Sequence, residues 1–117
     1  MDECNLACCE LADGEPLDPA AAEDLSVGFK ALGDSHRVAV VDLLLRAGEP
    51  VCVVDIERHL PLAQSTVSYH LKFLADAGVL DRERKGRWMY YTVKSERLED
   101  LHEALGRWLD PTRARSR

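Results

Sequence analysis

Apolar residues recur every three or four positions through the first two thirds of the chain, the spacing at which side chains share one face of a helix. The first such segment begins near Pro19, where proline suits a first helical turn. It places Leu25, Phe29 and Leu32 on one face and meets a stop signal at Gly33. The pattern therefore predicts a first helix between Pro19 and Gly33.

Three further helical segments follow at short intervals. Asp34 or Ser35 is suited to cap the second, which should end at Gly48. Its apolar face is predicted to hold Val38, Val41 and Leu45. A short third helix of about two turns should follow Pro50, with Cys52 in its first turn and Val53, Ile56 and Leu60 facing inward. A fourth helix is predicted over roughly 64–77, closed by Gly78.

The period of the pattern changes after Gly78. The run "VLDRERKGRWMYYTV" alternates as strands do and predicts a β-hairpin with a tight turn at Lys85-Gly86. A final helix is expected over about 95–109, with its stripe formed by Leu98, Leu101, Leu105 and Trp108. The predicted order is helix-helix-helix-helix-strand-strand-helix, which is a mainly α fold with a β-hairpin.

The chain of 117 residues has the length of one domain. Residues 1–18 lack a sustained period and form a predicted flexible acidic arm that contains three cysteines, residues 19–110 form the domain, and residues 111–117 form a basic tail. No apolar run approaches the roughly 20 residues that span a bilayer, and the N-terminus lacks the features of a secretory signal. We therefore expect a cytoplasmic protein that has no membrane partner and whose thiols stay reduced.

Charge is distributed unevenly along the chain. The net charge is −6, yet residues 1–24 alone carry eight acidic residues and no Lys or Arg. The remaining 93 residues hold 13 acids and 15 bases, and the bases are concentrated between Arg58 and Lys94. Because local charge matters more than the total, the acidic pI does not exclude binding to nucleic acid.

The predicted helix over 64–77 has two chemically different faces. Val67, Leu71 and Leu74 form an apolar face, and the opposite face offers hydroxyls, a phenol and a lysine. A short helix, a brief turn and such a helix constitute a helix-turn-helix arrangement, and the basic hairpin tip "RERKGR" suits a wing that touches phosphate or the minor groove. The candidate DNA-contacting residues are Gln64, Ser65, Thr66, Ser68, Tyr69, His70, Lys72, Arg84, Lys85 and Arg87.

The run from "ALGDSHRVAVVDLLL" to "AQSTVSYHLKFLADAGVLDRERKGRWMYYTV" resembles the ArsR/SmtB family of winged-helix metalloregulatory repressors. The likeness covers about residues 25–109 and implies a winged helix-turn-helix homodimer built from the first and last helices. It also implies a double-stranded operator with two inverted half-sites about one helical turn apart. Ala63 departs from the family, which often has a capping Ser at this position.

The resemblance implies that sensing sites must be assigned residue by residue. A zinc site on the last helix would begin with Asp100 and His102, but the positions of its other two ligands hold Arg113 and Ser116, so we reject it. A second family site has the pattern "C-V-C-D-L-C" at the start of the helix before the recognition helix. Here that stretch is "CVVDIE", and only Cys52 is retained.

The N-terminal stretch "CNLACC" supplies the missing thiols. Soft ions select thiolates, and about ten extended residues between Cys9 and the first helix span up to about 33 Å. Cys8, Cys9 and Cys52 would form a three-thiolate site for As(III) or Sb(III), and the vicinal pair resembles that of arsenite-responsive members. Cys4 could instead complete a four-thiolate site for Cd(II), Pb(II) or Zn(II).

Two other interpretations remain open on the sequence alone. A disulfide between Cys4 or Cys9 and Cys52 would make the protein a redox-sensing repressor. A small thiol enzyme or metal carrier is a different class of function. We expect no enzyme, because no His or acid stands beside a cysteine as an evident base except Glu10 in the tail.

Overall fold

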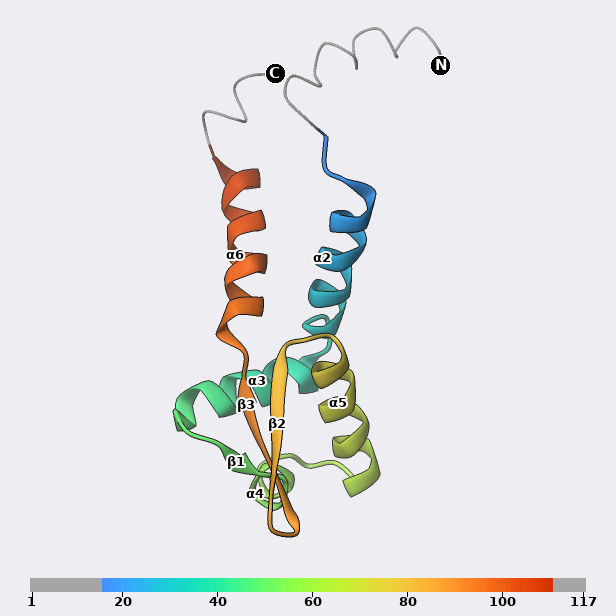
Figure 1. Ribbon diagram of the computed structural model, residues 1–117. Helices are drawn as coiled ribbons and strands as arrows, with labels where there is room; N and C mark the ends of the chain where they lie inside the picture. The colour runs from blue at the N-terminus through green and yellow to red at the C-terminus, as the bar shows by residue number, and fades with distance from the viewer. Residues whose placement is uncertain (1–15, 111–117) are drawn as a thin grey trace, which may run out of the picture.

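The computed structural model describes residues 16–110 and confirms a mainly helical fold with a β-hairpin (Figure 1). Most of the arm predicted at 1–18, with Cys4, Cys8 and Cys9, and the tail predicted at 111–117 therefore lie outside the described residues. The elements are α2 (Pro19–Ala31), α3 (Ser35–Ala47), β1 (Val51–Cys52), α4 (Val53–Arg58), α5 (Gln64–Asp76), β2 (Leu80–Lys85), β3 (Trp88–Val93) and α6 (Ser95–Leu109).

The predicted helix ends of α2 and α3 are confirmed by their caps. The Asp18 carboxylate accepts a hydrogen bond from the Ala21 amide at 3.3 Å. The Asp34 carboxylate accepts one from the His36 amide at 2.8 Å. Gly48 ends α3 with φ of 71°, a left-handed conformation that favours glycine.

The predicted apolar face of α3 is wrong for two of its three residues. Val41 is buried, but the side chains of Val38 and Leu45 are 49% and 51% exposed. The buried face is instead formed by Arg37, Val40, Val41 and Leu44. Because valines and leucines surround most of this helix, its periodicity does not select one face.

The structure adds a strand that the sequence pattern did not reveal. The two-residue strand β1 pairs antiparallel with β3, so the sheet has three strands in the order β1-β3-β2. Cys52 lies opposite Tyr90 and is the N-cap of α4, one residue before the first turn in which we expected it. Two residues are too few to show strand alternation in a sequence.

The hairpin turn lies one residue later than predicted. Lys85 and Trp88 are partners at the ends of β2 and β3, so Gly86 and Arg87 form the turn. Gly86 has φ of 68°, which accounts for glycine at the tip.

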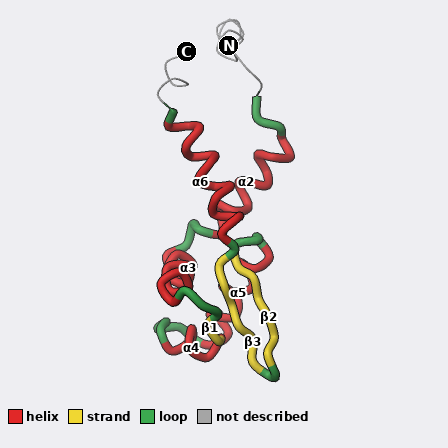
Figure 2. The backbone as a smooth tube through the Cα atoms, turned by 60° about the vertical axis from the view of Figure 1, so that its left-hand side comes forward, coloured by secondary structure: helices red, strands yellow, loops and turns green. Residues whose placement is uncertain are grey.

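The core lies between α3, α4, α5 and the sheet. Its fully buried large side chains are Val40, Ile56, Val67, Leu71, Leu74, Val79 and Leu80. Helices α2 and α6 contact each other and project together from one end of this body, whereas the hairpin tip lies at the opposite end (Figures 1 and 2). No helix of residues 16–110 has the length and apolarity to cross a membrane.

Candidate nucleic-acid interface and cysteine site

The helix-turn-helix consists of α4, the connection 59–63 and α5. Helix α5 buries Val67, Leu71 and Leu74 against the core, as its pattern predicts. The opposite face is open to solvent, and Thr66 lies half-buried at its edge. The exposed residues predicted to contact DNA on this helix are Gln64, Ser65, Ser68, Tyr69 and Lys72.

The N-terminus of α5 carries no side-chain cap. Ala63 occupies the N-cap position, and only its carbonyl takes part in the first turn, accepting from the Thr66 and Val67 amides at 3.0 Å each. The first amides of a helix have no intrahelical acceptors and carry part of the positive end of the helix dipole. At this end of α5 the amides of Gln64 and Ser65 are therefore available to a phosphate oxygen.

Two exposed side chains of α5 have neighbours that restrict them. The Tyr69 ring is 57% exposed and lies edge-on to His70 and Phe73, at centroid distances of 5.4 and 6.0 Å. The Lys72 ammonium pairs with the Asp76 carboxylate at 2.9 Å on the surface. Such an exposed pair is weak, so Lys72 can exchange it for a phosphate at little cost.

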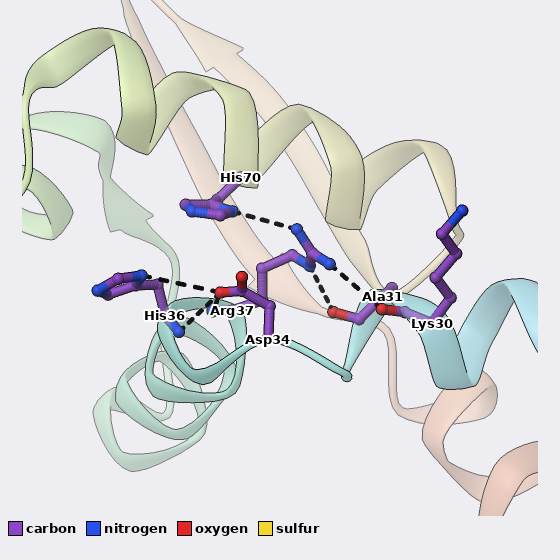
Figure 3. A network of polar contacts seen from close by, with 6 residues as sticks. All are labelled: Lys30, Ala31, Asp34, His36, Arg37 and His70. Atoms are coloured by element: carbon purple, nitrogen blue, oxygen red, sulfur yellow. Dashed lines mark hydrogen bonds and ion pairs between the residues drawn. The ribbon is translucent and has the colours of Figure 1, made fainter.

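His70, which we expected among the DNA-contacting residues, points into the protein. Its ring is buried beneath α5, and its Nδ1 lies 3.3 Å from Nη1 of Arg37 (Figure 3). Since His70 follows Val67 by three positions, it belongs to the buried face of the helix. Its role in this structure is to join the recognition helix to α3.

Arg37 is the centre of a buried polar network. Its Nε donates to the carbonyl of Ala31 at 2.8 Å and its Nη2 to that of Lys30 at 3.3 Å (Figure 3). The guanidinium also lies 4.1 Å from the centre of the Phe73 ring, a cation–π contact. One side chain of α3 thus holds both the end of α2 and the middle of α5.

The carboxylate of Asp34 and the rings of His36 and His70 bring possible metal ligands within 4.8 Å of one another. Arginine has only donors, so its hydrogen bond makes His70 Nδ1 an acceptor and places the ring proton on Nε2. A metal ion would have to displace Arg37 or the Nε2 proton. A divalent ion would also place two positive charges beside the Arg37 guanidinium, with only the Asp34 carboxylate to balance them. The group is accordingly a hydrogen-bond network.

The Asp34 carboxyl is ionised more readily than usual. Partial burial acts to raise its pKa, but the hydrogen bonds from the Arg37 and His36 amides and the nearby His70 and Arg37 side chains outweigh it. The pKa is therefore lowered from the ordinary value of 3.8. Asp34 caps α3 as a carboxylate at neutral pH.

The hairpin presents the predicted basic tip. Residues 81–88 are all exposed, among them Arg84, Lys85 and Arg87. Lys85 Nζ lies 5.3 Å from the Tyr90 ring centre, and the Arg87 guanidinium 5.8 Å from that of Trp88. The hairpin tip formed by the end of β2 and the start of β3 stands at the end of the molecule away from α2 and α6 (Figure 1). This arrangement suits a wing that contacts the DNA backbone.

Cys52 is half-buried, with a free thiol, at the junction of β1 and α4. Cys4, Cys8 and Cys9, its predicted partners, lie outside the described residues. Asp100 and His102 are exposed on α6.

Two residues that organise the site escaped the sequence analysis. Arg37 has no distinguishing signal except that it follows the capping Asp34 by three positions. Arg97 of α6 binds acceptors on α2 and just beyond α5, 73 and 20 residues away in the chain. No spacing rule connects positions so far apart.

The solved structures most similar to this one include winged-helix regulators. An ArsR family transcriptional regulator superposes with a TM-score of 0.68 and 26% identity over 74% of this chain and 88% of that one. A homodimeric DNA-binding domain from Mycobacterium bovis superposes with a TM-score of 0.62 and 25% identity, over 80% of this chain and 90% of that one. An antimony-specific transcriptional repressor superposes with a TM-score of 0.64 and 29% identity, over 80% of this chain and 84% of that one.

Sequence relatives lead to the same group. The arsenical resistance operon repressor of Bacillus subtilis is 40% identical over 62% of this chain and 69% of its own length. The cadmium resistance regulatory protein CadC homolog of Staphylococcus aureus is 32% identical over 87% and 78%. The family model for bacterial regulatory proteins of the arsR family matches residues 34–82, from the cap of α3 into β2. The chain belongs to the ArsR family of DNA-binding transcription regulators.

Proposed function

We propose that this protein is a metalloid-responsive transcriptional repressor. A homodimer binds an inverted-repeat operator, and As(III) or Sb(III) releases it by binding to the thiolates of Cys8, Cys9 and Cys52. The arsenical and antimony functions of the relatives named above support the class of inducer. The position of Cys52 supports the coupling of an inducer to DNA binding.

Dimer formation would use the surface of α2 and α6. Several large apolar side chains are exposed there: Val27 on α2, and Leu105, Trp108 and Leu109 on α6. The homodimeric structure from Mycobacterium bovis supports a homodimer for this chain. A twofold axis at this end would present two recognition helices and two wings to one face of DNA.

The observation that carries the sensing proposal is the place of Cys52 in the backbone. It pairs with Tyr90 of β3, the inner strand of the wing, and it is the N-cap of α4, the first helix of the helix-turn-helix. An ion held by this thiolate acts on the wing and on α4 together. Allosteric release requires that the residues that bind the inducer also orient both DNA-contacting elements.

Release follows from a difference in affinity between two dimer arrangements. A coupling of about 3 kcal/mol lowers DNA affinity more than a hundred-fold, within the usual allosteric range. The acidic arm, which carries most of the eight acidic residues in 1–24, would be drawn toward Cys52 when the ion binds. Its charge opposes DNA binding and adds to the release, less so at high salt.

The number of thiols favours a three-coordinate ion. As(III) and Sb(III) take three thiolates, which Cys8, Cys9 and Cys52 provide whether they come from one chain or two. Val54 stands where related cadmium sites have a further cysteine. The similarity to the cadmium regulator of Staphylococcus aureus makes a Cd(II), Pb(II) or Zn(II) sensor that uses all four cysteines the second candidate.

The deciding experiment is a mobility shift on the DNA upstream of the protein's own gene, titrated separately with As(III), Sb(III), Cd(II), Pb(II) and Zn(II) under reductant. Cys52→Ser should bind this DNA like the wild type and no longer be released by As(III). Cys4→Ser should keep its As(III) response. If Cys4→Ser no longer responds to As(III), and the wild type also responds to Cd(II), the results would instead favour the four-thiolate sensor.

Two results would contradict the proposed inducer and its binding site. Release of Cys52→Ser by As(III) at the wild-type concentration would remove Cys52 from the site. Release of the wild type by peroxide, with no response to As(III) under reductant, would identify a redox sensor.

A further inference from the structure

Arg97 joins three helices through one nearly buried guanidinium. Its side chain is 11% exposed, although Arg97 lies in the first turn of α6. Nη1 donates to the Asp24 carboxylate at 2.9 Å, Nη2 to the Asp24 carbonyl at 2.7 Å, and Nε to the carbonyl of Ala77 at 3.1 Å. Asp24 lies in α2, and Ala77 is the C-cap of α5.

Gly28 creates the space for this side chain, and Gly78 lies beside it in ordinary van der Waals contact. A Cβ on Gly28, buried in the interior of α2, would lie 3.2 Å from Arg97 Cζ and 2.9 Å from Leu101 Cδ2. A Cβ on Gly78 would lie 3.7 Å from Arg97 Nε, and Gly78 has φ of +81°. Glycine is disfavoured inside a helix, so its presence at Gly28 indicates that the close approach of α2 to α6 around Arg97 matters.

The contact uses features of arginine that lysine lacks. The planar guanidinium offers donors in several fixed directions, and here three of its nitrogens reach three acceptors at once. A lysine ammonium at the end of a flexible stem cannot hold the same three partners in one plane. The Ala77 carbonyl is one of the terminal acceptors that a helix end leaves unsatisfied, and Arg97 supplies its donor.

Arg97 and Arg37 attach the recognition helix to α2 at two separate points. Arg37 ties the middle of α5, through His70, to the carbonyls of Lys30 and Ala31 at the end of α2. Arg97 ties the C-cap of α5 to Asp24, two turns earlier in α2. One attachment would leave the angle between the two helices free, whereas two attachments fix it.

We propose that Arg97 is a positioning residue that sets the angle between the recognition helix α5 and the α2–α6 pair, and thereby the half-site spacing that the dimer accepts. The inference rests on the proposed function, because it requires a dimer through α2 and α6 on an inverted repeat. Arg97 itself touches no DNA in this scheme. It determines whether both recognition helices reach their half-sites at once.

The test uses Arg97→Lys in the full-length dimer. Affinities are measured for the mapped operator, for operators whose half-sites are moved one or two base pairs apart or together, and for a single half-site. We expect Arg97→Lys to bind the native operator about ten-fold or more weakly and to discriminate less between spacings. Its affinity for the single half-site should equal that of the wild type, since α5 and the wing are unchanged.

Arg107→Lys is the matched control, because Arg107 lies on the same helix and makes an exposed pair with Glu103 at 3.9 Å. It should keep the wild-type spacing preference. Sedimentation and urea unfolding check that each variant remains a folded dimer. Asp24→Asn removes only the charge at Oδ2, on an exposed carboxylate, and decides the question if Arg97→Lys does not fold.

Wild-type spacing preference in Arg97→Lys, or in Asp24→Asn where the lysine variant is unfolded, overturns the inference. Equal weakening on the single half-site and the full operator overturns it as well, because the defect then lies within one DNA-binding unit. A wild-type protein that binds no specific DNA would instead contradict the proposed function, so the two failures are distinguishable.

Discussion

Arg37 of α3 donates a hydrogen bond to Nδ1 of His70 in the recognition helix across 3.3 Å. Both side chains are buried, and the same guanidinium also holds the end of α2 and covers the Phe73 ring. The orientation of α5 is therefore set by buried polar contacts as well as by apolar packing.

Replacement of Arg37 by Ala should destabilise the protein strongly. It removes a charged donor from two backbone carbonyls and from His70. The Ala31 carbonyl and His70 Nδ1 would lose this donor in a buried setting, whereas the Lys30 carbonyl keeps its bond from the Gly33 amide. We expect a loss of at least about 2 kcal/mol in the free energy of unfolding, measured by urea denaturation.

Arg46→Ala on the same helix is the control for Arg37→Ala. Its pair with Asp42, at 2.7 Å, is exposed, so a change below about 1 kcal/mol is expected. Similar losses in the two variants would contradict the importance of the buried network.

Serine at position 63 should stabilise the protein. Ala63 has the extended N-cap conformation, with φ of −63° and ψ of 152°, but no side-chain oxygen to accept a bond from the first turn of α5. Ala63→Ser should add roughly 0.5–1 kcal/mol to the free energy of unfolding. Ala39→Ser, at an exposed position inside α3, should instead destabilise slightly, by about 0.5 kcal/mol. Thermal unfolding of both variants gives the sign of each effect.

Removal of one wing cation should weaken DNA binding to a similar extent for every DNA sequence. Arg84→Ala is expected to lower affinity for specific and non-specific DNA alike and to reduce the slope of log affinity against log salt by about 1. Ser68→Ala on α5 should change the preference between sequences and leave the slope unchanged, because a neutral hydroxyl displaces no counterion.

Arg107→Ala, far from the wing on α6, is the control for the salt slope and should match the wild type. A slope for Arg84→Ala equal to that of the wild type would show that the hairpin tip does not contact phosphate.

The Asp34 cap should contribute stability that depends on pH. The pKa of Asp34 is lowered in the folded protein, so its contribution is present above the unfolded value of about 3.8 and is lost as pH falls through the folded pKa. The melting temperature of the wild type should therefore exceed that of Asp34→Ala at pH 6–7, and the gap should shrink below pH 4.

Asp34→Asn tests the origin of this pH dependence. Asparagine also caps helices but does not titrate, so it should retain part of the stability at neutral pH and show no such decline in acid. A gap between wild type and Asp34→Ala that is constant from pH 7 to pH 3 would contradict the assignment.

Strong periodicity made parts of the fold predictable. The final helix was expected over about 95–109 and is Ser95–Leu109, and the recognition helix was expected over 64–77 and is Gln64–Asp76. Both sequences place apolar and polar residues at helical spacing, so their periodicity favours a helix over a strand. Helix α3 has apolar residues around most of its circumference, and there the predicted face was wrong.

The connections between distant segments could not be predicted. His70 lies on the buried side of α5 by its spacing from Val67, but a histidine in a hydrophilic motif suggested DNA contact. Its partner Arg37 is 33 residues away, and Arg97 binds backbone carbonyls, which any residue type provides. Sequence patterns indicate which face of a helix is buried, but they do not identify the polar group that packs against that face.

Because β1 is continuous with α4 and paired with β3, the wing and the helix-turn-helix share the strip of backbone at Val51–Cys52. An insertion or deletion in β3 would change the register in which Cys52 faces Tyr90, and with it the start of α4. New operator preferences should therefore evolve through side-chain replacement on α5 and the hairpin tip. Length changes in β1 or β3 would shift the hairpin and α4 relative to each other, and purifying selection should remove them.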